Sequence, residues 1–309
     1  MIFLLVALGC TSLMMGAQWF TPTDLLGVRG DYFSTLFIES RLSRTLAAAL
    51  SGSSLAVAGL LMQMLVRNRF AEPATTGSME GATLGFIVAA LCCPDAALSM
   101  KVGIAVIAAG LSCLTFITMV SRLPATARYM ASLVGLVLSG ILYSVATAVA
   151  IDNNLMQSVG AWSLGDFSAV IRGRYEWLWA GALCTVAMFM LAPHFTISGL
   201  GKDISTGLGL NHALVMTIGI ILVSIISATV IVTVGNLPFI GLVIPNIVRT
   251  LVGDNVKTCL PWVATGGAVL VLACDVLSRS LIYPHEVPAG TVVGVVGCLA
   301  LLMIIRGRS

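Results

Sequence analysis

The sequence has little charge. Only 9% of its 309 residues are Asp, Glu, Lys or Arg, whereas 58% are hydrophobic, and the mean hydropathy is +1.04. A water-soluble protein of this size would lack the polar side chains that its surface needs. The same composition excludes disordered, collagen-like and disulfide-rich chains. The chain is therefore an integral membrane protein.

Several signatures of enzymatic chemistry are also missing. The segment from Gly199 to Lys202 has neither the spacing nor the hydroxyl residue of a phosphate-binding loop. No H-E-x-x-H motif occurs, and His194, His212 and His285 have no metal-ligand spacing. The net charge of +3 is too small to indicate nucleic-acid binding. We expect a chain without catalytic residues that holds no metal or cofactor of its own.

Apolar runs of about 20 residues, the length that crosses a bilayer, recur along the whole chain. They predict an all-α protein of about ten transmembrane helices in one polytopic domain, residues 1–309. The run at 236–253 carries Pro238 and Pro245, so we expect it to be broken or partly re-entrant. A short amphipathic helix is expected within 152–174, and a polar, glycine-rich segment at 193–212. The predicted spans are 2–19, 45–66, 74–92, 102–120, 131–151, 177–192, 213–234, 236–253, 262–283 and 289–305.

Small residues form stripes on several of these spans. Gly52, Ala56, Gly59 and Gln63 share one face of the second, and Gly290, Gly294 and Gly297 share one face of the tenth. Such stripes allow close helix packing. They also suit the wall of a translocation path, where Gln63 and Glu80 would supply polarity. The candidate path residues are Gln63, Glu80, Gly290 and Gly294.

Charges near the span ends are few. Asp275 and Arg279 are four residues apart on the ninth span, so they share a face and are expected to pair. Glu72 and Glu286 precede helix starts beside prolines, where capping is the expected role. Basic residues divide almost evenly between the two faces, so the positive-inside bias that puts the N-terminus inside is weak. Arginines kept on the outer face indicate another purpose, such as an acidic partner.

An ordered set of motifs resembles a known family. The set comprises Arg41 to Leu46, Gly59 to Gln63, Asn68 to Pro73, Phe239 to Arg249, Gly253-Asp254 with Leu260-Pro261, Asp275 with Arg279, and Glu286 to Gly290. In this order the chain is similar to the permeases of type II ABC importers, the family of the vitamin B12 and iron-siderophore permeases. It departs from the usual pattern at Ser43, at Asn246 and at 297–300. Together with 75–80, these departures look closer to the catecholate-siderophore branch.

The resemblance implies a ten-span subunit in the bacterial inner membrane that moves an iron-siderophore complex from periplasm to cytoplasm. It implies a second permease chain, with a heterodimer plausible and a homodimer open, two cytoplasmic ATPase subunits that hold ATP and Mg, and a periplasmic binding protein. Arg41 and Arg279 match the family's docking arginines for that binding protein. The segment from Ser198 to Leu210 matches the coupling helices against the ATPase; its candidate residues are Ser198, Gly201, Lys202, Asp203, Gly207 and Gly209.

Two other function classes compete with an ATP-driven importer. A secondary transporter would need ion-coupling residues near the midplane, and Asp275 is the best candidate for that role. A membrane-embedded enzyme would need a catalytic constellation, and the serines and histidines suggest none. Uptake that persists without ATP but collapses with a protonophore would favour the secondary transporter.

Overall fold

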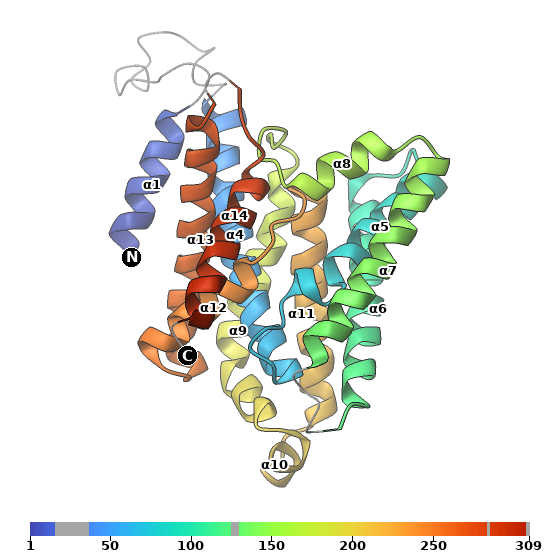
Figure 1. The fold of residues 1–309 in the computed structure, drawn as a ribbon, viewed down its shortest axis with the longest axis vertical. Coiled ribbons are helices and arrows are strands. Elements are labelled where there is room, and N and C mark those ends of the chain that lie inside the picture. Colours follow the sequence, from blue (N-terminus) through green and yellow to red (C-terminus); the bar gives the residue numbers. More distant parts are fainter. Residues whose placement is uncertain (16–36, 125–129, 283–284, 307–309) are drawn as a thin grey trace.

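The structure is a computed structural model, and it describes residues 1–15, 37–124, 130–282 and 285–306. Apart from one isolated bridge between Ile282 and His285, the regular structure in these ranges is helical (Figure 1). Six of the helices are long and apolar enough to cross a membrane. They are α4 (Ser43–Val66), which η1 (Phe37–Leu42) extends, α6 (Leu98–Ser121), α7 (Ala131–Asp152), α9 (Leu178–Gly199), which η4 (Tyr175–Trp177) precedes, α11 (His212–Thr233) and α13 (Val256–Ser280).

Four further apolar helices are shorter: α1 (Ile2–Met14), α5 (Ser78–Cys92), α12 (Ile240–Val252) and α14 (Ala289–Arg306). Each predicted span overlaps an apolar helix, but only six of these helices have the length of a membrane crossing, and residues 16–19 of the first predicted span lie outside the described ranges. The short helix expected within 152–174 is α8 (Met156–Leu164). Two other short elements are η2 (Pro73–Thr75), which precedes α5, and α10 (Lys202–Gly207), which lies between α9 and α11.

Prolines do not stop the helices where the sequence predicted an end. α9 continues through Pro193, and α13 starts at Val256 with Pro261 inside it. The predicted ends at 192 and 262 are therefore wrong. A proline inside a helix removes one N–H donor and leaves a carbonyl four residues earlier without its partner. Such a helix persists where other groups satisfy that carbonyl or where neighbouring packing holds it.

The helix predicted to be broken, α12, shows how a proline is accommodated. Pro245 lies inside it, so the carbonyl of Gly241 lacks the N–H that residue 245 would otherwise donate. The side-chain amide of Gln63, on α4, donates to that carbonyl at 3.3 Å. α12 is therefore continuous, and the chain reverses before it, where Gly235 and Phe239 both have left-handed backbone angles.

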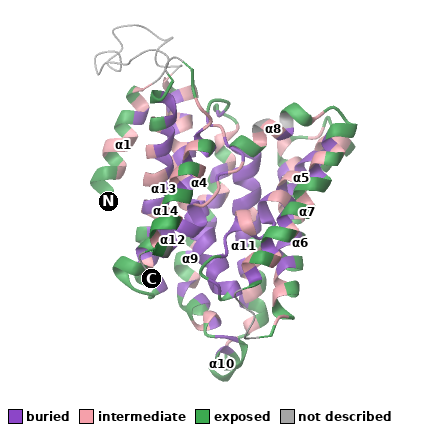
Figure 2. Cartoon of the chain, in the orientation of Figure 1, coloured by how far each residue is buried: buried purple, intermediate pink, exposed green. Residues whose placement is uncertain are grey.

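α4 forms the centre of the molecule and packs against α9, α11, α12 and α13. In its most apolar 18-residue stretch 78% of the residues are buried, against 22% in α7 (Figure 2). Close approach requires glycine here: a Cβ added at Gly59 would fall 2.0 Å from the carbonyl oxygen of Gly241 on α12. The small-residue stripe of α4 is thus a packing surface.

The elements place two candidate regions at opposite ends of the molecule. The C-terminal ends of α1 and α13 meet the start of α4 at one end, and α10 protrudes at the other (Figure 1). The first region carries the predicted docking arginines, and the second carries the predicted coupling residues.

Candidate functional site

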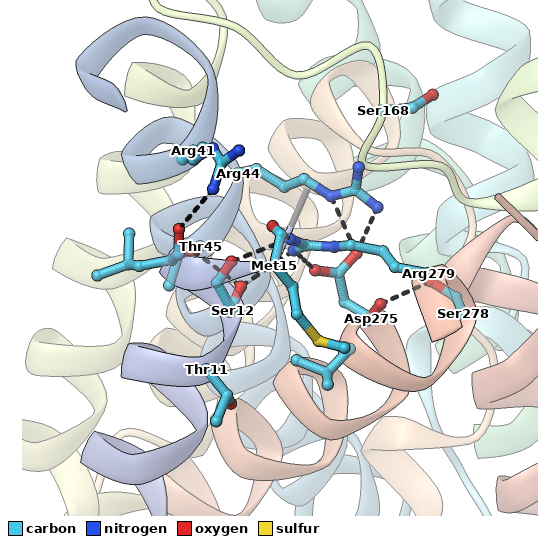
Figure 3. Close-up of polar contacts among 12 residues, drawn as sticks. Thr11, Ser12, Met15, Arg41, Arg44, Thr45, Ser168, Asp275, Ser278 and Arg279 are labelled. Carbon is cyan, nitrogen blue, oxygen red and sulfur yellow. Dashed lines mark hydrogen bonds and ion pairs between the residues drawn. The ribbon is translucent and has the colours of Figure 1, made fainter. Parts of the chain in front are cut away.

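Asp275 is the centre of an ionic cluster at the first end. Its side chain has no exposed surface, and Arg44 approaches it with Nε and Nη2 at 3.1 and 2.8 Å from Oδ1. Arg279 pairs with the other oxygen of the same carboxylate, as the four-residue spacing predicted. Arg44 also donates Nη1 to Glu286 at 2.7 Å. The Asp275 carboxylate therefore pairs with two guanidinium groups, that of Arg44 from α4 and that of Arg279 from α13 (Figure 3).

Arg41 and Arg279 bind the C-terminal turn of α1. Arg41 Nη1 donates to the carbonyls of Leu13 and Met14, each at 3.1 Å. Arg279 Nη1 donates to the carbonyls of Ser12 and Met15, each at 3.0 Å, and Nη2 donates to Ser12 Oγ at 3.0 Å (Figure 3). The last carbonyls of a helix have no intrahelical donor and attract positive charge.

A docking role would require Arg41 and Arg279 to project outward, but in this structure they do not. Arg41 is 7% exposed and Arg279 is 8% exposed, because both side chains turn inward to cap α1. Their docking role stays a prediction. The sequence analysis assigned no role to Arg44. The signal that could have identified it is its spacing, because a residue three positions after Arg41 lies close to it on a helix.

The two carboxylates expected to cap helices behave differently. Glu72 forms a capping box with Thr75 at η2, as predicted, and its Oε1 also accepts the backbone N–H of Phe239 at 3.2 Å, just before α12. Glu286 pairs with Arg44. One glutamate thus joins the α4–α5 connection to α12, and the other joins the α13–α14 connection to α4.

α10 is held between two spans by a small polar network. Nδ1 of His212, the first residue of α11, lies 3.1 Å from Ser198 Oγ and 3.1 Å from Ser205 Oγ. Ser205 donates its hydroxyl to the Lys202 carbonyl at 3.0 Å, so it can accept from His212. Ser198, on α9, thereby joins α10 and α11. The network fixes the base of the protruding segment.

Two glycines turn the chain into and out of α10. Gly201 has φ +117° and Gly209 has φ +80°, a region that side chains rarely adopt. Gly207 is the last residue of the helix and has no such angle. The tip between these turns exposes Lys202 and Asp203 together with the apolar Ile204 and Leu208, which are 52% and 64% exposed. An exposed apolar surface with charges beside it suits contact with another protein.

The four predicted path residues lie on three helices, α4, α5 and α14. Gln63 is 3% exposed, and its side chain lies between the Gly241 carbonyl and Arg249 Nη1, which donates to it at 3.1 Å. A Cβ at Gly290 would meet the Leu164 carbonyl at 2.3 Å. Packing therefore explains both residues. Among the described residues, only Pro238 lies within 4 Å of a Cβ added at Gly294, at 3.6 Å.

Glu80 differs from the other three because it carries a buried carboxylate oxygen. It lies in the first turn of α5, and its Oε2 has no hydrogen-bond partner among the described residues. Within the same ranges, no three His, Cys, Asp or Glu side chains lie together as metal ligands would.

Comparison with known proteins agrees with this geometry. The model of the FecCD transport family matches residues 4–307. The chain belongs to the FecCD transport family. It is 39% identical to the petrobactin import system permease protein YclN of Bacillus subtilis, covering 99% of this chain and 97% of that protein. It is 38% identical to the ferric-anguibactin transport system permease protein FatD of Vibrio anguillarum, covering 100% and 98%.

A solved structure shares the fold of this FecCD family member. It is described as an inward-facing conformation of a metal-chelate type ABC transporter, with a TM-score of 0.83 and 22% identity. The match covers 99% of this chain and 97% of that one. The permease fold predicted from the motifs is confirmed by this likeness.

Proposed function

We propose that this chain is the permease subunit of an ATP-driven importer that moves an iron-siderophore complex from periplasm to cytoplasm. The observation that carries the proposal is the full-length similarity to permeases named for petrobactin and ferric-anguibactin. Membership of the FecCD family over residues 4–307 supports the same class. The ordered motifs from Arg41 to Gly290 agree with it.

The proposed architecture is one polytopic domain of ten crossings in the bacterial inner membrane. Six helices have the required length, and four shorter apolar helices complete the set. A helix of 13 residues, such as α1 or α12, is only about 20 Å long. The hydrocarbon core is about 30 Å thick, so neither of these two helices spans it alone.

The two ends of the molecule suit two different partners. The end with Arg41, Arg44 and Arg279 is the proposed docking face for a periplasmic binding protein, whose acidic residues would have to draw these guanidinium groups away from their present contacts with α1 and Asp275. The protruding α10 supplies an exposed surface for a cytoplasmic ATPase, which holds ATP and Mg. Exposed apolar side chains on α7 and α14, among them Leu136, Ile141 and Leu299, suit a second permease chain or lipid.

Transport in a reconstituted system tests the proposed function. The chain is incorporated into liposomes with its partner permease and ATPase, binding protein is supplied outside, and uptake of an iron-55 siderophore is measured. We expect uptake that requires ATP, and a preference for catecholate over citrate complexes. Uptake without ATP that collapses on adding a protonophore would instead support a secondary transporter.

A further inference from the structure

A pocket of about 270 Å³ lies at the end of the molecule that carries α10. It is open on one side and is lined by the C-terminal ends of α4, α6 and α9, the turn between α9 and α10, and the first turns of α11. α4 ends at Val66, α6 ends at Ser121 and α11 begins at His212. Three membrane-spanning helices thus begin or end around this pocket, which places it where their apolar segments meet the polar interface.

The charged side chains that line the pocket are all basic. Arg67 and Lys202 contribute to it, together with His212, and no carboxylate is among the lining residues in the part of the chain that the structure describes. Arg67 follows α4 in a left-handed conformation, with its backbone N–H bonded to the carbonyls of the last turn. Its guanidinium crosses the backbone of Gly201: a Cβ added there would fall 2.7 Å from Arg67 Nη1. Glycine at 201 therefore lets Arg67 form one wall.

The opposite part of the lining is apolar. Ile117 and Val120 of α6 and Met216 of α11 contribute to it, beside the hydroxyl of Ser121. A pocket with cations at the polar end and hydrocarbon at the membrane end matches an amphiphile with an anionic head. Basic pockets between transmembrane helices on the cytoplasmic side bind phospholipid headgroups in this way.

We infer that this pocket binds the phosphate headgroup of an anionic phospholipid, with the acyl chains continuing along α6 and α11. The volume holds a headgroup and not a whole lipid. An inorganic anion would use only the cationic half and would leave the apolar half exposed to water. The inference goes beyond the proposed transport function, and its test measures lipid binding and not uptake.

Lipid titration of the assembled transporter tests the inference. The detergent-purified complex is delipidated, then titrated with phosphatidylglycerol or with phosphatidylcholine of the same acyl chains, and bound lipids are counted by native mass spectrometry. We expect tighter binding of phosphatidylglycerol. Arg67→Gln and Lys202→Gln should each weaken that binding about fivefold, the effect of one basic residue at a membrane surface.

Control variants separate the pocket from general charge and from misfolding. Arg122→Gln removes an exposed arginine one residue after Ser121 that does not line the pocket, and it should leave binding unchanged. Lys202→Arg keeps the charge and should retain binding. Ser121→Trp keeps the charges of Arg67 and Lys202 but fills the pocket, so it should abolish the preference for phosphatidylglycerol over phosphatidylcholine.

Three results would overturn the inference. The first is equal binding of the two lipids to the unmodified complex. The second is an equal loss of binding in Arg122→Gln. The third is displacement of phosphatidylglycerol by millimolar inorganic phosphate, which would assign the pocket to a free anion.

Discussion

At the scale of single residues, Asp275 supplies the negative charge that allows Arg44 and Arg279 to be buried together. Its carboxylate has no exposed surface and pairs with both Arg44 and Arg279. We predict that Asp275→Asn destabilises the protein by about 3 to 5 kcal/mol, because two buried guanidinium groups lose their counter-charge. Thermal unfolding of the purified chain in detergent measures the change.

Glu286 provides the matched control. Its side chain is 33% exposed and pairs only with Arg44 among the described residues. Exposed ion pairs contribute little, so Glu286→Gln should cost less than about 1 kcal/mol. If the two variants unfold at the same temperature, the cluster is not organised around Asp275.

The docking arginines give a second residue-scale prediction. Reversal of Arg41 or Arg279 to Glu should weaken the binding protein's affinity by at least about 1 to 3 kcal/mol, the value of hydrogen bonds between charged groups. Arg41→Glu is the cleaner variant, because a glutamate at 279 would lie beside Asp275. Surface plasmon resonance with purified binding protein at physiological salt measures the affinity.

Ser12→Ala controls for the contact between Arg279 and α1. It removes the hydroxyl that Arg279 binds but leaves every charge in place. Docking should be unchanged in this variant. Unchanged affinity in both charge reversals would exclude Arg41 and Arg279 as docking residues.

At the scale of elements, the contact between α4 and α12 tolerates no added side chain. A Cβ at Gly59 would lie 2.0 to 2.4 Å from backbone atoms of Gly241. Gly59→Ala must push the two helices apart, so we predict a loss of at least about 1 to 3 kcal/mol, the usual cost of overpacking. Gly103→Ala on α6 meets nothing within 4 Å and should be neutral or slightly stabilising. The thermal unfolding temperatures of Gly59→Ala and Gly103→Ala measure the difference in stability.

The turn that leaves α10 gives a second prediction for an element. Gly209 has φ +80°, so Gly209→Val should strain the turn and shift α10 relative to α11, and uptake should fall at least tenfold. Gly103→Ala is the control, because Gly103 is helical within α6, has open space around it and lies outside the predicted coupling segment. Transport and stimulated ATP hydrolysis are measured together. Normal values in Gly209→Val would place the coupling contact elsewhere.

Hydropathy predicted the positions of the helices well because lipid requires each crossing to satisfy its own backbone. Their ends were less predictable. Pro193 and Pro261 looked like boundaries in the sequence, yet α9 and α13 continue through them. For Pro245 the compensation comes from Gln63, which is 182 positions earlier (245 − 63). No local pattern can indicate a partner so distant in the sequence.

At the scale of the whole molecule, the sequence predicted which residues lie at the two ends of the subunit, but not the directions in which their side chains point. The spacing of Asp275 and Arg279 predicted their pairing, because both lie on one helix. The inward turn of Arg279 depends on α1, whose terminal carbonyls reach it across the tertiary structure. The role of Arg44 depends likewise on α4 lying beside α13. Such relationships arise from helix packing and not from local spacing.

The arrangement of the whole subunit also separates the path candidates. Gln63 lies in the core between α4 and α12, whereas Gly294 shares a face of α14 with the exposed native Cys298 one turn later. We predict that Gly294→Cys reacts with a membrane-impermeant thiol reagent in at least one of the ATP-bound and nucleotide-free complexes. Gln63→Cys should stay unreactive in both, because exposing it would require α4 and α12 to separate.

The labelling experiment has internal controls. Cys113, Cys184, Cys259 and Cys274 are buried and can remain, so only Cys10, Cys92, Cys93 and Cys298 need replacement. A chain that keeps Cys298 as its one accessible cysteine reports whether reagent reaches that face of α14. Reaction at Cys298 without reaction at Gly294→Cys in either complex would assign Gly294 to helix packing. Reaction at Gln63→Cys would show instead that the path runs between α4 and α12.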